Sequence, residues 1–259
     1  MIALITGASS GIGEEFAKNL ASRGFNLILV ARRRERLKEI KEKITNIFDV
    51  RVKTICLDLS KTECCKRLYE EVSKLHIDIL INNAGFGLFG KFDKTDLDRE
   101  LEMIDVNIKA VHVLTKLFLQ DFKHRNYGYI LNVASIAGFM AGPLMATYYA
   151  SKNYVLQLTR AVSQELRHDN VNVYVGALCP GPVDTEFNRV AGAQFAIGGS
   201  TATEIAEYGI EEMFKGKTVI IPKKEIKALA MLSKAVPSRL MLWGTYFAQT
   251  ARRGDPSDD

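Results

Sequence analysis

Short apolar segments recur along this chain, and longer amphipathic stretches separate them. The apolar segments are the candidate strands: Ile2 to Ile5, Asn26 to Ala31, Val50 to Leu57, Ile77 to Ile81, Tyr129 to Val133, Val171 to Leu178 and Thr218 to Ile221. Several are continuous rather than alternating, which is typical of strands that are buried on both faces. Strands that alternate with helices form a parallel sheet. We therefore predict an α/β fold, a doubly wound parallel sheet of seven strands with helices on both faces.

The amphipathic stretches are the candidate helices. They are Gly11 to Arg23, Glu35 to Phe48, Thr62 to Leu75, Asp96 to Lys123, Met145 to His168, Thr203 to Phe214 and a tail from Lys224 to Thr250, which Pro237 divides. No Pro/Gly/Ser-rich linker interrupts the 259 residues, and α/β folds of about 250 residues commonly form one domain. Asn107 falls in the middle of a long predicted helix, where asparagine has mediocre propensity. Either this side chain faces solvent or the site requires it.

Charge and cysteine content exclude several classes of protein. The formal charge is +5, and the basic residues are scattered among acidic ones, so we do not expect nucleic-acid binding. The four cysteines show no C-x-x-C spacing, which argues against a metal site and against a disulfide framework. The first residues lack the basic segment of a signal peptide, and no apolar run reaches the roughly 18 residues that span a bilayer. We expect a cytoplasmic protein.

A glycine-rich turn follows the first candidate strand and precedes the first candidate helix. Its sequence is Thr6-Gly7-Ala8-Ser9-Ser10-Gly11-Ile12-Gly13. Small residues let the backbone approach a pyrophosphate, and the free N–H groups at a helix start attract negative charge. The spacing differs from the common G-x-G-x-x-G fingerprint, so the interpretation depends on the position between strand and helix. The turn predicts a dinucleotide site.

Arginines end the second candidate strand. A ribose-binding acid is expected about 20 residues beyond the glycines in a protein that binds NAD, but the sequence there is Leu29-Val30-Ala31-Arg32-Arg33. A guanidinium suits a 2′-phosphate because it forms bidentate, charge-assisted hydrogen bonds. The segment therefore favours NADP(H). Arg34 and Arg36 are interpreted as the start of a solvated helix.

A phenol and an ammonium group lie four residues apart on one predicted helix. Tyr148 and Lys152 share a helix face, and Ser135 lies thirteen residues before Tyr148. A fixed cation beside a phenol favours the phenolate and would lower its pKa toward the neutral range. The arrangement is suited to general acid/base catalysis. The same spacing also occurs as a surface pair on many helices, so the rest of the chain must support the interpretation.

Taken in order, these motifs resemble those of the short-chain dehydrogenase/reductase family. The matching features are the glycine-rich turn, Asn82-Asn83-Ala84-Gly85 after the fourth candidate strand, Asn107, Ser135, Tyr148, Lys152 and Pro180-Gly181. The match covers residues 2 to about 222. It is most similar to a bacterial branch with Val-Ala-Arg-Arg after the second strand and an extended apolar carboxyl-terminal tail.

The resemblance implies a single-domain Rossmann-like fold and an enzyme. Hydride would pass between NADP(H) and a carbonyl/alcohol pair. Residues 1–222 would form the dinucleotide-binding catalytic domain, with a substrate lid at about 186–202. Residues 223–259 would form a helical extension packed on the body or at an interface.

The resemblance also assigns catalytic roles. Tyr148 would be the acid in reduction and the base in oxidation, while Lys152 would lower its pKa and hold the nicotinamide ribose. Ser135 would hydrogen-bond the substrate oxygen and stabilise developing charge. Asn107 would fix a water that links Lys152 to solvent. The family pattern selects Tyr148 over Tyr149, which is interpreted as packing or substrate-pocket surface.

Further matched positions would bind the cofactor, together with Tyr148 and Lys152. They are Gly7, Ser9, Ser10, Gly11, Ile12 and Gly13 in the turn, Arg32 and Arg33 at the 2′-phosphate, Asp58 at the adenine, Asn83, Ala84 and Gly85 near the adenosine ribose, and Pro180, Gly181, Val183 and Thr185 around the nicotinamide. Asn82 is equally compatible with a role in stabilising the central sheet.

The segment from Glu186 to Ala202 is small and apolar in character. It contains Phe187, Val190, Phe195, Ile197 and the pair Gly198-Gly199. In the family this region is a mobile lid that excludes water, so we expect a hydrophobic ketone or aldehyde as substrate. The alternative is a loop whose apolar residues only cover the core.

The tail is basic and apolar, and it contains the single tryptophan of the chain, Trp243. Such a segment can lie on a membrane surface, but Trp, Tyr and Phe are also favoured at protein interfaces. We expect it to pack on the body or on a sister subunit rather than on a membrane. Because family members commonly pair through the helices that hold Asn107 and Tyr148, we expect a homodimer or homotetramer.

Two other functions remain compatible with the sequence. One is a catalytically silent module that binds and senses NADP(H), and the other is a membrane-surface reductase of lipid-like substrates. The presence of Ser135, Tyr148 and Lys152 together argues against the silent module.

Overall fold

The chain folds around a parallel sheet of seven strands, in a computed structural model that describes residues 1–183, 185–191 and 200–250. The strands are β1 (Ile2–Thr6), β2 (Asn26–Ala31), β3 (Val52–Cys56), β4 (Ile79–Asn82), β5 (Tyr129–Val133), β6 (Tyr174–Leu178) and β7 (Val219–Ile220). Their order is β3-β2-β1-β4-β5-β6-β7, and every neighbouring pair is parallel. The predicted fold is confirmed, although β3 and β4 each begin two residues later than predicted and β6 begins three residues later.

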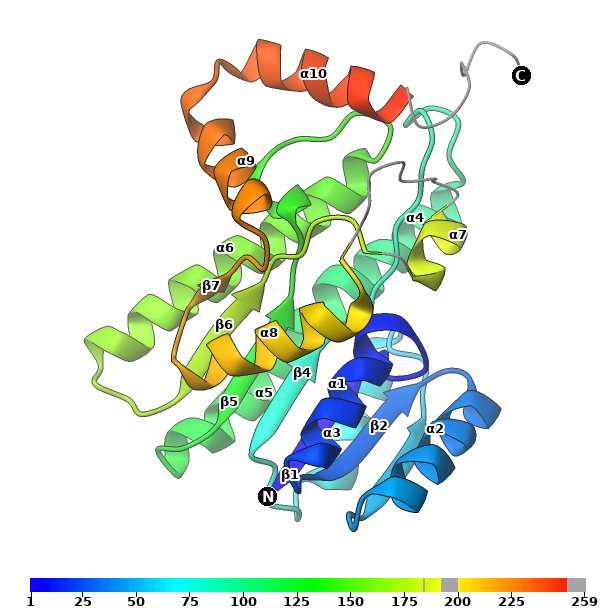
Figure 1. Cartoon of the computed structure of the whole chain (residues 1–259), viewed down its shortest axis with the longest axis vertical. Coiled ribbons are helices and arrows are strands. Elements are labelled where there is room, and N and C mark those ends of the chain that lie inside the picture. Colours follow the sequence, from blue (N-terminus) through cyan, green and yellow to red (C-terminus); the bar gives the residue numbers. More distant parts are fainter. Residues whose placement is uncertain (184, 192–199, 251–259) are drawn as a thin grey trace.

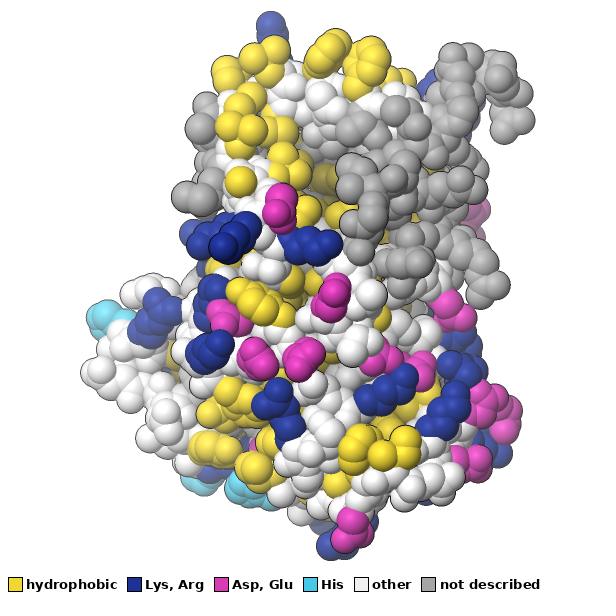
Figure 2. All heavy atoms as spheres, viewed as in Figure 1, with side chains coloured by type: hydrophobic (Ala, Val, Ile, Leu, Met, Phe, Trp, Pro, Cys, Tyr) yellow, Lys and Arg dark blue, Asp and Glu magenta, His cyan; other side chains and the backbone are white. Residues whose placement is uncertain are grey.

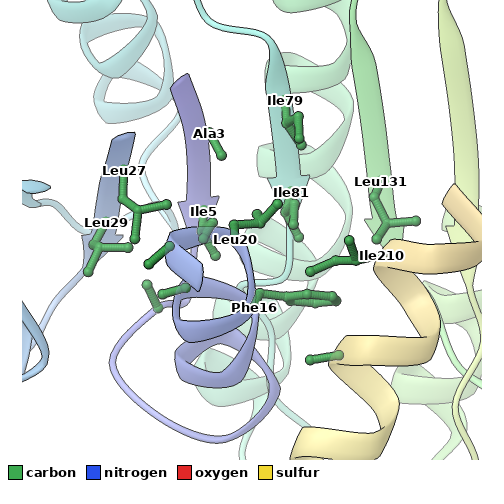
Figure 3. Close-up of a cluster of buried hydrophobic side chains, with 14 of the residues drawn as sticks. Ala3, Ile5, Phe16, Leu20, Leu27, Leu29, Ile79, Ile81, Leu131 and Ile210 are labelled. Atoms are coloured by element: carbon green, nitrogen blue, oxygen red, sulfur yellow. The ribbon is translucent and has the colours of Figure 1, made fainter. Parts of the chain in front are cut away.

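Helices cover both faces of the sheet (Figure 1). The helices α1 (Gly11–Ser22), α2 (Arg34–Ile47) and α8 (Ala202–Phe214) contribute buried side chains to the cluster on one face, and α3 (Thr62–Val72) and α5 (Val111–His124) to the cluster on the other. Along β1, Ala3 and Ile5 enter the first cluster while Leu4 enters the second, because successive strand residues point to opposite faces. Figure 3 shows the first cluster, in which Phe16 of α1 and Ile210 of α8 lie beside the strands.

The strand order reverses beside β1, which pairs with β2 on one side and β4 on the other. Ligands of open α/β sheets bind at the carboxyl ends of the strands at such a switch point. The glycine-rich turn follows β1, and Asn83 follows β4. The Thr6 hydroxyl accepts hydrogen bonds from the backbone N–H groups of Asn83 and Ala84, at 3.0 and 3.1 Å. The two segments are therefore joined at the expected site.

The long helix predicted between Asp96 and Lys123 is interrupted. It consists of α4 (Leu97–Ile104), a π-helical segment η1 (Asp105–Ala110) and α5. Asn107 lies in η1 and is fully buried, so of the two alternatives left by the sequence the solvent-facing one is wrong. π-Helical turns inside α-helices are frequent at functional sites.

The helix predicted from Met145 is α6 (Ala146–His168), and two short helices were not predicted. These are the 3₁₀ helix η2 (Ile136–Phe139) and α7 (Glu186–Ala191). The tail divides at Pro237, as predicted, into α9 (Lys224–Ala235) and α10 (Ser238–Thr250). In Figure 1 the two helices form an arch over the carboxyl edge of the sheet. Within the described ranges, no helix combines the length and the apolar character that crossing a membrane requires.

Candidate active site

A cavity of about 1390 Å³ extends from the glycine-rich turn, past the start of α6, to the inner sides of α9 and α10. Every site residue predicted from the sequence lines it, apart from Gly13 and Asn107. Its position is the switch point of the sheet, where a ligand is expected. The fold therefore brings segments that are far apart in the sequence to one site.

The turn after β1 fits a dinucleotide pyrophosphate. Gly7 has a φ of +65°, and a Cβ atom there would lie 2.7 Å from the backbone of Ala84. A Cβ atom on Gly13 would lie 2.3 Å from the carbonyl oxygen of Gly7. Glycine at position 13 therefore permits the start of α1 to pack closely against the backbone of the turn. Ser10 caps α1 with extended backbone and makes no side-chain capping bond. The first N–H groups of α1 are thus available to an anion.

The two arginines after β2 have different partners. The Arg33 guanidinium donates to the Ser9 hydroxyl, at 3.1 and 3.2 Å, and to the Ser9 carbonyl at 3.1 Å. It also pairs with Glu186 of α7 at 2.9 Å. Arg32 instead pairs with Glu102 of α4 at 2.6 Å. Arg33 is therefore the arginine held directly against the glycine-rich turn, and neither acidic partner was predicted from the sequence.

Ser135 and Tyr148 bring their hydroxyl groups together. Ser135 follows β5, where its Oγ accepts from the Ala137 N–H at 3.1 Å, and Tyr148 lies in the first turn of α6. The Tyr148 ring contacts that of Phe187 in α7, with centroids 5.4 Å apart. Burial of the phenol raises the pKa of Tyr148, and the hydrogen bond with Ser135 lowers it by a smaller amount. The phenol retains its proton at neutral pH and is a proton donor.

Lys152 is only 6% exposed. Its Nζ donates to the carbonyl of Val133 at 2.8 Å and lies 5.9 Å from the centroid of the Tyr148 ring. Burial lowers the pKa of Lys152 from 10.5 to about 8. The predicted net fall in the pKa of Tyr148 is not found in this structure, because burial of the phenol is the largest influence and raises the pKa. The role of Lys152 in stabilising the phenolate stays a prediction.

Asn107 anchors the segment that follows β4. Its Oδ1 accepts from the Phe86 N–H at 3.1 Å, and its Nδ2 donates to the Phe86 carbonyl at 2.9 Å and to the Ser151 hydroxyl at 3.1 Å. Gly85 permits this approach, since a Cβ there would lie 2.8 Å from the Asn107 oxygen. Asn107 thus fixes Phe86 relative to α6, and its water-binding role stays a prediction.

Asn82 belongs to the sheet rather than to the cavity. It donates to Thr115 at 3.1 Å and to Asn132 at 2.8 Å, and Asn132 donates to Thr159 at 3.0 Å. All four side chains are buried. This chain of hydrogen bonds joins β4, β5, α5 and α6, which supports the structural alternative for Asn82.

Sequence reasoning missed several residues near the reaction site. Ser151 is fully buried and holds Asn107, although its position directly before Lys152 was a signal. Gln249 of α10 donates to the Tyr149 hydroxyl at 3.0 Å, and nothing in the local sequence indicated this contact. Apolar side chains of Met140, Met145 and the tail line the same part of the cavity.

The predicted lid is described in part. Phe187, which lies in the predicted lid, lines the cavity. Phe195, Ile197, Gly198 and Gly199 lie outside the described residues. Across 1–183, 185–191 and 200–250, no three His, Cys, Asp or Glu side chains are grouped so that they could hold a metal ion.

A dinucleotide turn at a sheet switch point, with a serine, a proton-donating tyrosine and a lysine in one cavity, defines a nicotinamide-dependent oxidoreductase. A family model described as short chain dehydrogenase matches residues 1–196. The chain belongs to this family of oxidoreductases, which act on carbonyl/alcohol pairs with NAD(P).

Relatives by sequence include oxidoreductases from distant organisms. An uncharacterized oxidoreductase of Staphylococcus saprophyticus is 33% identical over 215 residues, which are 82% of this chain and 91% of that protein. A very-long-chain 3-oxoacyl-CoA reductase of Anas platyrhynchos is 33% identical over 198 residues, 74% of this chain. That alignment spans only 63% of the Anas protein.

Solved structures share the fold over nearly the whole chain. A short-chain dehydrogenase from Sphingobium yanoikuyae in complex with NADPH has a TM-score of 0.83 and 28% identity, and the match covers 99% of this chain and 98% of that one. A bulky-bulky ketone specific alcohol dehydrogenase from Comamonas testosteroni has a TM-score of 0.80 and 28% identity, with coverage of 94% and 93%.

Proposed function

We propose that this protein is an NADP(H)-dependent reductase of hydrophobic ketones or aldehydes. The observation that carries the proposal is that Ser135, Tyr148 and Lys152 line one cavity, which is continuous from the glycine-rich turn to the apolar inner side of α9 and α10. We also propose that it works in the cytoplasm as a homodimer or homotetramer.

The residues divide the reaction between them. The nicotinamide, when bound, supplies or receives the hydride. Ser135 holds the substrate oxygen and stabilises the charge that develops on it. Tyr148, which burial keeps protonated, delivers its proton to that oxygen during reduction. Lys152 lies beside the Tyr148 ring, where a cation stabilises the phenolate left after proton transfer.

The size and lining of the cavity support a bulky apolar substrate. Beyond Tyr148 the wall consists largely of apolar residues, including Met145, Leu229, Leu240 and Met241. The Comamonas relative is named for bulky ketones, and the Anas relative for very-long-chain 3-oxoacyl groups. Both names fit a carbonyl compound with a large apolar part.

Replacing the two adjacent tyrosines tests the catalytic assignment. Tyr148→Phe removes the proton donor, and we expect kcat for reduction of a bulky aryl ketone to fall at least 100-fold, while the dissociation constant for NADPH stays within about twofold. Tyr149→Phe is the matched control and retains most of the turnover. The measurement is NADPH oxidation at the nicotinamide absorbance band, with cofactor binding followed by fluorescence. Equal activity of the two variants would reject the role of Tyr148, and a wild type that oxidises no NADPH with any carbonyl would favour the silent binding module.

The different partners of the arginines make cofactor preference testable. Arg33→Ala removes the guanidinium at Ser9, and we expect NADPH to bind at least tenfold more weakly while NADH binding changes little, since a charge-assisted bond to phosphate is worth about 1.5–3 kcal/mol. Arg32→Ala is the control, and we expect a smaller effect because the partner of Arg32 is Glu102 on α4, whereas Arg33 is held at Ser9 of the glycine-rich turn. Calorimetric titration of both cofactors gives the comparison. Tighter binding of NADH than NADPH by the wild type would contradict the preference.

A further inference from the structure

One face of α10 lines the cavity. That face carries Leu240, Met241, Gly244, Thr245 and Gln249. Residues three to four positions apart share a helix face, so Met241, Thr245 and Gln249 form a single stripe. The other side of α10 presents exposed apolar residues such as Trp243 and Phe247.

Gln249 is the residue of this stripe with a polar atom left over. The Thr245 hydroxyl donates to the Met241 carbonyl at 2.7 Å, so the backbone of the helix satisfies it. The Gln249 side chain is 2% exposed, and its Nε2 donates to Tyr149. Its Oε1 is buried and has no hydrogen-bond partner in the described part of the chain. A buried acceptor without a partner is destabilising, and it therefore calls for an explanation.

The location of this acceptor suggests the explanation. Gln249 lines the cavity, and it binds Tyr149, whose ring centroid lies 6.1 Å from that of Tyr148. The acceptor thus stands on the substrate side of the proton donor, whereas the cofactor residues follow β1, β2 and β4. Met140 and Met145 line the same cavity with apolar side chains, and Met145 packs against Tyr148 and Tyr149. A polar group in such a wall orients a ligand, because pockets of this kind combine apolar lining with few placed polar atoms.

We propose that Gln249 is a substrate-binding residue that selects for a hydrogen-bond donor. Its Oε1 accepts from a hydroxyl or an amide N–H that the substrate carries at a distance from the reacting carbonyl. The substrate is then a bulky apolar ketone or aldehyde with one remote donor group. This inference rests on the proposed reductase function and adds the substrate's second polar group to it.

Paired probe substrates test the selection. The probes are phenyl alkyl ketones whose alkyl chains end in a hydroxyl group four to eight carbons from the carbonyl, each paired with its methyl ether. The hydroxyl can donate to Oε1 and the ether cannot. We expect kcat/KM of the wild type to favour the hydroxyl member at least tenfold at one or more chain lengths, mainly through KM. In Gln249→Met, which keeps the volume and removes the acceptor, the ratio falls to about one.

Two control variants separate recognition from a structural role. Tyr149→Phe removes the hydrogen bond between Gln249 and α6 but keeps the Gln249 Oε1. If Gln249 had only a structural role, the hydroxyl preference would fall equally in this variant and in Gln249→Met. We expect Tyr149→Phe to keep most of the hydroxyl preference. Thr245→Val changes a neighbouring residue of the same stripe whose hydroxyl already bonds the backbone, and the preference should stay within twofold of the wild type. Melting temperatures show whether each variant is folded.

The outcomes distinguish this inference from the proposed function. Reduction of the ketones without any hydroxyl preference, or a preference that survives in Gln249→Met, overturns the role of Gln249 and leaves the reductase intact. If no probe is reduced, the reductase proposal fails, and calorimetric binding of the same probe pairs to the wild type with NADPH then decides the role of Gln249. Equal affinity for alcohol and ether at every chain length overturns it. If Gln249→Met does not fold, Gln249→Leu provides the same loss of acceptor.

Discussion

At the scale of single residues, the reaction site contains a lysine whose charged form is disfavoured by burial. Lys152 is 6% exposed, and its partner is a neutral carbonyl, that of Val133. A charge buried without an opposite charge is unfavourable, and this is expressed in the fall of the pKa of Lys152 to about 8. Catalytic sites commonly reduce stability in this way.

The lowered pKa of Lys152 makes a prediction about stability and pH. Lys152 stays protonated up to about pH 10.5 in the unfolded chain but only up to about pH 8 in the folded protein. Between these two pH values the unfolded chain binds more protons, so the contribution of Lys152 to the free energy of unfolding rises with pH. We expect Lys152→Met to be inactive yet more stable than the wild type at pH 7, by up to roughly 3 kcal/mol less the lost hydrogen bond. The gain should disappear as the pH approaches 10.5. Urea unfolding of both proteins at several pH values measures it.

Lys116→Met is the control for this experiment, because Lys116 lies exposed on α5. We expect it to change stability little at any pH. A Lys152→Met protein that is less stable than the wild type at pH 7, or a difference that does not vary between pH 8 and 10.5, would contradict the prediction.

Residue identities at the site were predictable, but their environments were not. Ser135, Tyr148 and Lys152 were found because their chemistry appears in the spacing along the chain, and the structure places all three in one cavity. The direction of the Tyr148 pKa shift was predicted incorrectly, since the spacing gives the neighbour on the helix and not the depth of burial. Gln249 was missed for a similar reason, because its partner Tyr149 lies 100 positions away.

At the scale of elements, the periodic segments were predictable and the irregular ones were not. Strand positions follow from apolar runs, so all seven were found. The π-helical segment η1 was missed, because Asn107 is held by Phe86 and Ser151, which lie 21 and 44 positions away in the sequence. Local propensity could indicate that Asn107 was unusual in a helix, but only these tertiary contacts define the conformation.

The turn between β1 and α1 gives a prediction at this scale. In Gly13→Ala the new Cβ would lie 2.3 Å from the backbone oxygen of Gly7, and backbone cannot move aside easily. We expect overpacking to cost about 1–3 kcal/mol of stability and dinucleotide binding to weaken at least tenfold as the turn shifts. Thermal unfolding and calorimetric titration of NADPH provide the measurements.

Gly244→Ala is the matched control, since no atom of the described residues lies within 4 Å of the position that its Cβ would occupy. Gly244 lies inside α10, so alanine should stabilise that helix by about 1 kcal/mol and leave NADPH binding unchanged. Similar effects of the two substitutions would show that the packing of the turn does not limit binding.

At the scale of the whole molecule, the arch of α9 and α10 leaves an apolar surface exposed. Trp243 and Phe247 are 64% and 57% exposed, and Figure 2 shows hydrophobic side chains gathered over the region of these helices. Large exposed apolar patches mark interaction sites. Among the described residues, Gln249 of α10 bonds to the body of the protein, while Trp243 and Phe247 form an exposed apolar surface that suits a partner.

The exposed side of the tail predicts self-association. We expect the wild type to have two or four times the mass of one 28.9 kDa chain. In the double variant Trp243→Ser, Phe247→Ser, the dissociation constant of the oligomer should rise at least tenfold, because aromatic residues dominate interface energies. Light scattering after gel filtration measures the masses. Ile47→Ser is the control, since Ile47 is 72% exposed on α2, away from the tail. A wild type that floats with liposomes, and a double variant that does not, would instead support the membrane-surface reductase.

The contact between Arg33 and Glu186 has a consequence for selectivity. The guanidinium already serves a carboxylate of its own chain while it is held at Ser9. Any anion that takes this position competes with an internal ligand and not only with water. The net binding free energy of the incoming anion at Arg33 is therefore the difference between its interaction and that of Glu186, and added salt screens both interactions. Discrimination at this point depends on how many bonds each anion accepts from the planar guanidinium group rather than on charge alone.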